Sequence, residues 1–446
     1  MAPERHLPRK ANFLNAVFLD IVLTAFAVAA FRQITWTGGA EEAPMSVLGT
    51  SMIDAAAGSV TLAIGLVGVM ALFLGLMKVA EQGGLLVIIA KTLRPLLIRL
   101  FPDVPAEHPA MGAMILNMAA NVLGLGNAAT PFGIRAMQQL EALNPLKGTA
   151  SNSMALFLAI NTSSITILPT GVIALRAAAG SVDPAGIVPT TLFATICSTT
   201  VAIIACKFLE KRWRSPPADP DQAAEDSVIP ATDDFSDVPE APAGAGGAYP
   251  IWVSVAALAG VAALVPLTVF HGRAVAPWII PGLMVGLLSF GALRGVSVYE
   301  AFVEGAKDGF NVALRIIPYL VAILVAVGMF RASGAMALII QPLGAITELV
   351  GLPPDALPMA LLRPLSGSGA YGILASIIQN PAIGPDSYVG YLVSTFQGST
   401  ETTFYVLAVY FGAVGIRRIR HALVAALLAD LAGICGAVFI VSYLYG

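Results

Sequence analysis

The chain has 446 residues, of which 57% are hydrophobic and 11% are charged. Because soluble proteins carry about 25% charged residues, this composition excludes an ordinary soluble protein. It indicates an integral membrane protein that is embedded in the lipid bilayer. The formal net charge of -3 argues against a nucleic-acid partner, which selects a strongly basic surface.

The N-terminal part is predicted to contain a first span, a long helix and an interfacial helix. The apolar run at 13–31 follows a basic stretch, and an uncleaved span is favoured over a signal peptide because Asn15 and Asp20 suit a signal sequence poorly. Residues 52–80 form a glycine-spaced apolar helix. Residues 85–100 end in basic residues and a proline, which indicates an interfacial or re-entrant helix.

Two apolar stretches that follow are interrupted by polar and small residues. Residues 117–131 contain three Asn, two Gly, one Thr and one Pro, and residues 161–166 read Asn-Thr-Ser-Ser-Ile-Thr. Helical backbone satisfies its own hydrogen bonds in lipid, whereas broken backbone persists at membrane depth only where protein or a water-filled cavity covers it. The two breaks therefore predict a site inside the membrane.

A polar segment divides the chain into two membrane halves, at 1–214 and 250–446. The first half ends with a span at 187–208 and a basic, aromatic end at 210–214, which is typical of a cytoplasmic face. Residues 215–249 contain eight acidic residues and no Lys or Arg, which predicts a disordered cytoplasmic linker.

The second half is predicted to contain more helices and two further breaks. The breaks are at 363–369, inside 356–380, and at 397–403, inside 388–415. A basic loop at 417–421 precedes the last span. The remaining predicted helices are 251–270, 277–293, 299–308, 310–330, 335–350 and 422–443.

The two halves contain a weak internal repeat, at 52–208 and 302–443, in which Asn117 aligns with Ser366 and Asn161 with Gln397. A basic segment follows the last span of the first repeat but precedes the last span of the second. Because Lys and Arg are enriched in cytoplasmic segments, the second copy is predicted to have the opposite orientation in the membrane. Inverted repeats with broken helices are typical of secondary transporters.

The polar residues at the four breaks are the candidate solute- or ion-binding residues. Glu401 is the most informative, because a carboxylate at membrane depth is costly unless it is paired or faces a cavity. Arg363 is its expected partner, or a bidentate ligand for an anionic solute. Asp430 aligns with Thr195 and is a candidate coupling-ion group. The full set is Asn117, Asn121, Asn127, Asn161, Thr162, Ser163, Ser164, Arg363, Ser366, Ser368, Gln397, Ser399, Thr400, Glu401 and Asp430.

Each candidate also has a structural interpretation. The amides can bond between packed spans, the hydroxyls can bond to the preceding helical turn, and the small residues can allow close helix packing. Glu401 and Arg363 can form a structural ion pair, and Asp430 can cap or pair near an interface. No GxSxG, HExxH or Walker motif occurs, and no spacing of His or Cys indicates a metal. The sequence therefore predicts no enzyme, no cofactor and no metal.

The motifs resemble a known family. The first half, with PAMGAMILNMAANVLGLGNAATPFGIRAMQQL, and the second, with YEAFVEGAKDGFNVALRIIPYLV and LLRPLSGSGAYG, closely resemble the two spore maturation proteins, A and B. The resemblance covers most of both membrane halves but not the linker. It implies a fusion of two members of the nucleoside recognition, or gate, family, whose domain is similar to parts of concentrative nucleoside carriers and ferrous-iron permeases. It implies no particular substrate.

Together these observations predict an all-α, polytopic bacterial inner-membrane protein with two inverted gate-type repeats. The N-terminus and linker are expected in the cytoplasm, and the C-terminus in the periplasm. The leading hypothesis is a secondary transporter for a small polar solute. A nucleoside-like solute is one candidate, and H+ and Na+ are the candidate coupling ions. The alternatives are a channel and a non-transporting scaffold that docks a partner through the linker. The sequence leaves open whether the protein forms a homodimer.

Overall fold

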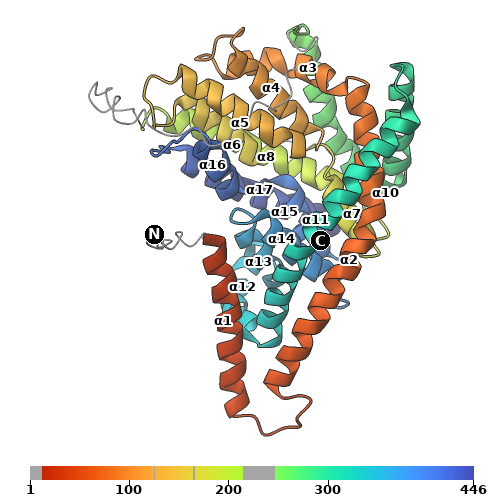
Figure 1. Cartoon of the computed structure of the whole chain (residues 1–446), viewed down its shortest axis with the longest axis vertical. Coiled ribbons are helices and arrows are strands. Elements are labelled where there is room, and N and C mark those ends of the chain that lie inside the picture. The colour runs from red at the N-terminus through yellow and green to blue at the C-terminus, as the bar shows by residue number, and fades with distance from the viewer. Residues whose placement is uncertain (1–12, 125, 164–165, 214–246) are drawn as a thin grey trace, which may run out of the picture.

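The computed structural model describes residues 13–124, 126–163, 166–213 and 247–446 (Figure 1). Almost all of the predicted linker lies outside these ranges. The α-helices, in chain order, are α1 (Phe13–Ile34), α2 (Pro44–Gln82), α3 (Leu85–Leu100), α4 (Pro109–Val122), α5 (Gly126–Leu143), α6 (Asn152–Ser163), α7 (Thr170–Ala178), α8 (Val188–Leu209), α10 (Ile251–Leu293), α11 (Val298–Ala332), α12 (Ala335–Thr347), α13 (Leu357–Leu362), α14 (Gly367–Ile378), α15 (Tyr388–Ser399), α16 (Thr403–Gly412) and α17 (Ala422–Tyr445).

Three of the described helices, α2, α8 and α17, are each long and apolar enough to cross a bilayer. A fourth candidate is the helix pair Pro342–Val350 and Pro354–Leu362, which is bent by 103° at a short break. At about 1.5 Å per residue, the 39 residues of α2 extend well beyond a hydrocarbon core of about 30 Å. The molecule is a multi-pass membrane protein, as its composition predicts.

The helices form two repeats with the same order of parts. Each repeat has a long helix (α2, α11), a short helix (α3, α12), a hairpin (α4–α5, α13–α14), a broken helix (α6–α7, α15–α16) and a closing span (α8, α17). Gly84 and Gly334 begin the two short helices with the same left-handed φ of 83°. Arg294 donates to the carbonyl just before Gly84, and Arg32 donates to the carbonyl just before Gly334, both at 2.9 Å. The span before each repeat therefore supports the turn of the other repeat.

Equivalent helices of the two repeats run antiparallel, as an inverted repeat requires. In the pair α2 and α11, and in the pair α8 and α17, residues later in one helix contact residues earlier in the other. The contacts that show this are Gly75 with Phe302, Gly328 with Ser51, Gly436 with Ala194 and Ser198 with Ala429. The prediction of two inverted repeats with broken helices is confirmed.

The helix α10 doubles back rather than running straight. Its 43 residues span about 65 Å when straight. Yet Tyr249, just before it, donates its N–H to Lys91 O (3.2 Å), and Arg294, just after it, binds Gly83 O. Residues 83 and 91 are close in the chain, so the two ends of α10 lie near one another. Its apolar arms, Ile251–Ala263 and Trp278–Leu293, occupy the places of the two predicted spans.

The hydrophobic core interlocks the two repeats. One buried cluster combines the α4–α5 hairpin and α6 with α16, and a second combines the α13–α14 hairpin and α15 with α7. The two halves of each broken helix therefore belong to different clusters. Figure 1 shows α4, α5 and α6 at one end of the molecule, α12 and α13 toward the other, and α15 and α17 between them. This arrangement brings both breaks to the boundary between the clusters.

Candidate functional site

Two hairpin tips and two helix breaks line an open cavity of about 230 Å³. Most of its wall is formed where a helix begins or ends, and both repeats contribute. The polar lining residues include Asn121, Thr166, Arg363, Gln397 and Glu401. The backbone is held by protein at each break, because Ile167 N–H donates to Val122 O (3.2 Å) and Phe404 N–H donates to Pro364 O (3.1 Å). Each break is thereby attached to the hairpin of its own repeat.

Arg363, at the tip of the α13–α14 hairpin, caps the end of α15. The side chain of Arg363 is 5% exposed. It donates to the carbonyls of Gln397 (3.2 Å) and Thr400 and to Oγ1 of Thr402 (3.0 Å). A cation at a helix C-terminus is favoured by the helix dipole and satisfies carbonyls that lack helical partners. Arg363 is therefore committed to the α15–α16 break, with only its Nε unpartnered among the described atoms.

Glu401 lies in the extended segment between α15 and α16 and lines the cavity. Its carboxylate is 3.9 Å from Arg363 Nη2, so the predicted pairing is present, and its side chain is 53% exposed. Its N–H donates to Thr162 O at 2.7 Å, which links the second break directly to the first. Gln397 also lines the cavity, and its Oε1 has no partner among the described atoms. The exposed carboxylate of Glu401 therefore presents hydrogen-bond acceptors to the cavity, whereas Gln397 Oε1 is buried.

The predicted asparagines form a network that reaches into the second repeat. Asn121 Nδ2 donates to Asn161 Oδ1 (2.9 Å), which also accepts from the hydroxyl of Tyr410 (3.4 Å). Asn117 Nδ2 donates to Ala129 O (2.7 Å) and to the Tyr410 hydroxyl (3.1 Å). Of the three, Asn121 lines the cavity, whereas Asn117 and Asn161 are buried behind it. The side chain of Asn127 lies outside the described part of the chain.

The predicted hydroxyl residues mostly bond to nearby backbone. Thr162, Ser163 and Ser399 each donate to the carbonyl three residues earlier, at 2.9, 3.1 and 3.4 Å. Ser366 caps α14 by accepting from Gly369 N–H at 3.0 Å. Thr400 is buried, Ser368 is exposed away from the cavity lining, and Ser164 lies outside the described residues. These hydroxyls shape the breaks rather than face the cavity.

Asp430, in α17, lies behind the α15–α16 break and is 4% exposed. Its Oδ2 accepts from Thr403 Oγ1 at 2.6 Å, and its Oδ1 has no partner among the described atoms. Thr195, its counterpart in α8, donates to Ser163 O at 2.8 Å. Each closing span therefore holds the broken helix of its own repeat through a side chain at this position, but only the second repeat uses an ionisable one.

Comparison with known proteins identifies the family. The model named Gate, described as nucleoside recognition, matches residues 63–179 and 313–417. Spore maturation protein B of Bacillus subtilis (strain 168) is 47% identical over 167 residues, covering 37% of this chain and 93% of that protein. Spore maturation protein A of the same organism is 49% identical over 154 residues, covering 34% and 79%. The chain belongs to the nucleoside recognition family. One part resembles protein B and another protein A, as in a fusion of the two.

Two solved structures are also similar to this nucleoside recognition protein. One is a CNTnw variant in an outward-facing state, with a TM-score of 0.41 and 12% identity. The other is the YdaH transporter of Alcanivorax borkumensis, with a TM-score of 0.34 and 15% identity. Both alignments cover 96% of this chain and 97% of the other.

Sequence reasoning missed Tyr371, which lines the cavity from α14. Its hydroxyl donates to Gly171 O at 2.7 Å, so it bridges the hairpin of the second repeat and the broken helix of the first. It missed Tyr410 in the asparagine network as well. Both tyrosines follow apolar residues within helices, and neither stands in a polar segment that marks a break.

Arg176, in the last turn of α7, is fully buried. Its guanidinium donates to Pro385 O (2.6 Å) and Asp386 Oδ1 (3.0 Å) and lies 4.3 Å over the ring of Tyr391. Asp386 also accepts from the N–H of Val182 (2.8 Å). The loop after α7 is thus joined to the loop before α15, in what we call the Arg176 junction.

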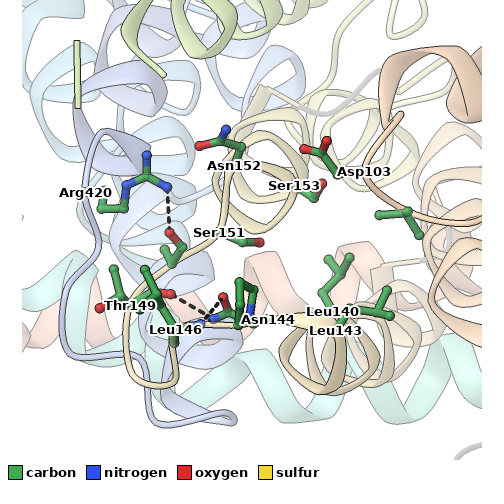
Figure 2. Close-up of a pocket in the computed structure, with 13 residues that line it drawn as sticks. Asp103, Leu140, Leu143, Asn144, Leu146, Thr149, Ser151, Asn152, Ser153 and Arg420 are labelled. Carbon is green, nitrogen blue, oxygen red and sulfur yellow. Dashed lines mark hydrogen bonds between the residues drawn. The ribbon is translucent and has the colours of Figure 1, made fainter. Parts of the chain in front are cut away.

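The inverted counterpart of this junction lies at the other end of the repeats. There the loop before α6 pairs with the loop before α17, through a bridge between Thr149 and Arg418. Arg420 donates to Ala150 O at 3.0 Å. Figure 2 shows Arg420 and Asn144 at a second cavity, of about 320 Å³, beside this loop. Asn144 is already bonded to Leu146 O and Thr149 O, both at 2.9 Å. This cavity therefore lies at a junction between loops rather than at a helix break.

Proposed function

We propose that this chain is a secondary transporter that moves a small polar solute across a bacterial inner membrane through the cavity at the four helix ends. The observation that supports the proposal is that both repeats line one cavity with broken backbone, where Glu401 places a half-exposed carboxylate. Irregular backbone at membrane depth is found where it borders a solute or ion path. A purely structural core has no need of an exposed carboxylate there.

The lining chemistry favours an uncharged solute that carries hydrogen-bond donors. Glu401 offers carboxylate acceptors, and the guanidinium of Arg363 is occupied by the α15–α16 break. Leu168 and Val172 add apolar surface to the same cavity. Hydroxyl and amine donors on a compact, partly apolar solute fit this lining, and nucleosides, after which the family is described, are the first class to test.

The proposed orientation follows the distribution of Lys and Arg. The basic ends at 211–214 and 417–421 lie in the cytoplasm, together with the N-terminus and the linker. The Arg176 junction and the C-terminus then lie on the periplasmic side. In this orientation each junction between loops closes one side of the path.

The test is solute flux into proteoliposomes that contain the purified protein. Radiolabelled nucleosides, amino acids and dicarboxylates are screened first, and a solute that binds is expected to raise the unfolding free energy by about 2.7 kcal/mol at a hundredfold excess over its Kd. Glu401→Gln is expected to reduce uptake at least tenfold, because the variant loses the charged acceptor in the cavity while the backbone bond to Thr162 remains.

Glu300→Gln is the matched control, because Glu300 is exposed in the first turn of α11, away from the cavity. It is expected to transport as the unmodified protein does. Equal uptake by Glu401→Gln and Glu300→Gln removes Glu401 from the mechanism. A folded protein that moves none of these solutes contradicts the transporter proposal and favours the scaffold.

A further inference from the structure

The carboxyl group of Asp430 is buried and forms no ion pair with a described residue. No Lys, Arg or His nitrogen in the described part of the chain lies within the 4.0 Å that defines an ion pair with it. Among the described residues, its side chain bonds to Thr403 alone, and Oδ1 is buried and has no partner there. Burying an ionised carboxylate without a countercharge or several donors costs far more than burying a neutral carboxylic acid.

The elements packed against α17 supply no other charge that compensates. They are α8, α6, α15 and α16. In α8, Cys197 faces Gly436, Cys206 bonds to Ala155 O, and Lys207 pairs with Glu210. The helix α6 contains no ionisable residue, and the ionisable residues of α15 and α16 are tyrosines. The charged groups nearby are Arg363, which acts on Asp430 electrostatically, and Glu401, which is paired with Arg363. Arg363 therefore interacts electrostatically with both Glu401 and Asp430, but it is hydrogen-bonded to neither oxygen of Asp430.

The geometry accommodates a proton. With the proton on Oδ2, the carboxyl O–H donates to Thr403 Oγ1 across the same 2.6 Å, and the orphan Oδ1 becomes a neutral carbonyl oxygen. A neutral acceptor without a partner is much cheaper to bury than a charged one. Thr403 is the first residue of α16, so this bond attaches the second half of the broken helix to the closing span.

We propose that Asp430 binds the coupling proton of this transporter. The inference rests on the proposed function and names its coupling ion. Protonated Asp430 holds α16 against α17 in the conformation described. Loss of the proton leaves a carboxylate that water must reach, which favours a second arrangement of the α15–α16 break. Because Glu401 and Arg363 belong to that break, solute binding and proton binding bias the same element.

Thr195 supports this assignment by contrast. It occupies the equivalent position of the first repeat, where it donates to the end of α6 at 2.8 Å. A threonine hydroxyl makes the same kind of attachment without titrating. The first repeat can therefore keep its attachment at every pH, whereas that of the second depends on a proton.

The first experiment needs no transport. Infrared spectra of the full-length protein at pH 7 are compared with those of Asp430→Asn and Glu401→Gln. A protonated-carboxyl absorption that is absent in Asp430→Asn but present in Glu401→Gln is expected. Its absence from the unmodified protein means that Asp430 is ionised, and overturns the proposal whether or not the protein transports.

The second experiment drives uptake with a pH gradient across proteoliposomes. At one proton per solute, a gradient of one pH unit sustains about tenfold accumulation, because each unit is worth about 1.4 kcal/mol. Asp430→Asn is expected to lose this accumulation, and Asp430→Glu to retain part of it, which controls for folding. Accumulation by Asp430→Asn equal to that of the unmodified protein overturns the proposal. A protein with the infrared absorption but no flux of any solute refutes the proposed function, and the coupling role fails with it.

Discussion

His421, in the loop before α17, makes acid stability a quantitative test of the structure. It is fully buried, and neither ring nitrogen has a partner among the described atoms. Burial, and then the neighbouring guanidinium of Arg420, lower the pKa of His421 from 6.5 to about 4. Protonation of this ring in the folded protein is therefore unfavourable over the whole interval between those two values.

The sign of the effect follows from proton linkage. Below pH 6.5 the unfolded chain binds a proton at His421 that the folded protein does not, so stability is full above pH 6.5 and falls as the pH drops toward 4. At about 1.36 kcal/mol per pH unit, the whole shift is worth at most ~3 kcal/mol, of which ~2 kcal/mol is lost by pH 5.

The variant that tests this is His421→Phe, which keeps a planar ring and removes the titration. Unfolding of the two proteins in the same detergent is followed at pH 8 and at pH 5. The unmodified protein is expected to lose ~2 kcal/mol more than the variant between these pH values. At pH 8 the variant is expected to be no less stable, because it removes two unpaired ring nitrogens. Parallel pH dependence in the two proteins refutes the burial argument.

Two further predictions concern helix packing and the Arg176 junction. Gly309→Ala places a methyl group 2.6 Å from backbone of Ala71 where α11 crosses α2, so a loss of ~1–3 kcal/mol in unfolding free energy is expected. Gly286→Ala, with nothing within 4 Å, is the control, and equal losses contradict the crossing. Arg176→Met leaves Asp386 without its cation and is expected to cost ~3 kcal/mol. The double variant with Asp386→Asn should recover part of that loss, and strict additivity of the two substitutions in a double-mutant cycle argues against coupling.

The breaks in the helices could be predicted from the sequence, because their polar and small residues do not suit a continuous apolar helix in lipid. A segment such as 161–166 is too polar for a continuous buried helix, and α6 does end at Ser163. The pairing of Arg363 with Glu401 was accessible for the same reason, since each is a charge that needs a partner. The inverted order followed from the positions of the basic segments.

The contacts between repeats were not accessible. Arg176 meets Asp386 across 210 residues, and Tyr410 meets Asn117 across 293. No local pattern specifies which distant element a side chain will face, and a lone Arg near the end of an apolar run has the ordinary interpretation of an interfacial anchor. The same limit applies to Arg32, which lies before the first repeat and donates from Nη1 to Ser333 O of the second repeat at 2.9 Å.

The differences between the two repeats are more informative about mechanism than their similarity. Symmetry explains the antiparallel spans and the paired turns, because each copy must bury the same surfaces. It does not explain why Arg363 aligns with Met114, or Asp430 with Thr195. Both changes introduce ionisable groups at one break only, and both are buried beside Glu401 or behind it. Buried charges destabilise a fold unless they are compensated. Among the described residues, the first repeat lines the cavity with no ionisable side chain, so the proposed response to solute and proton belongs to the α15–α16 break.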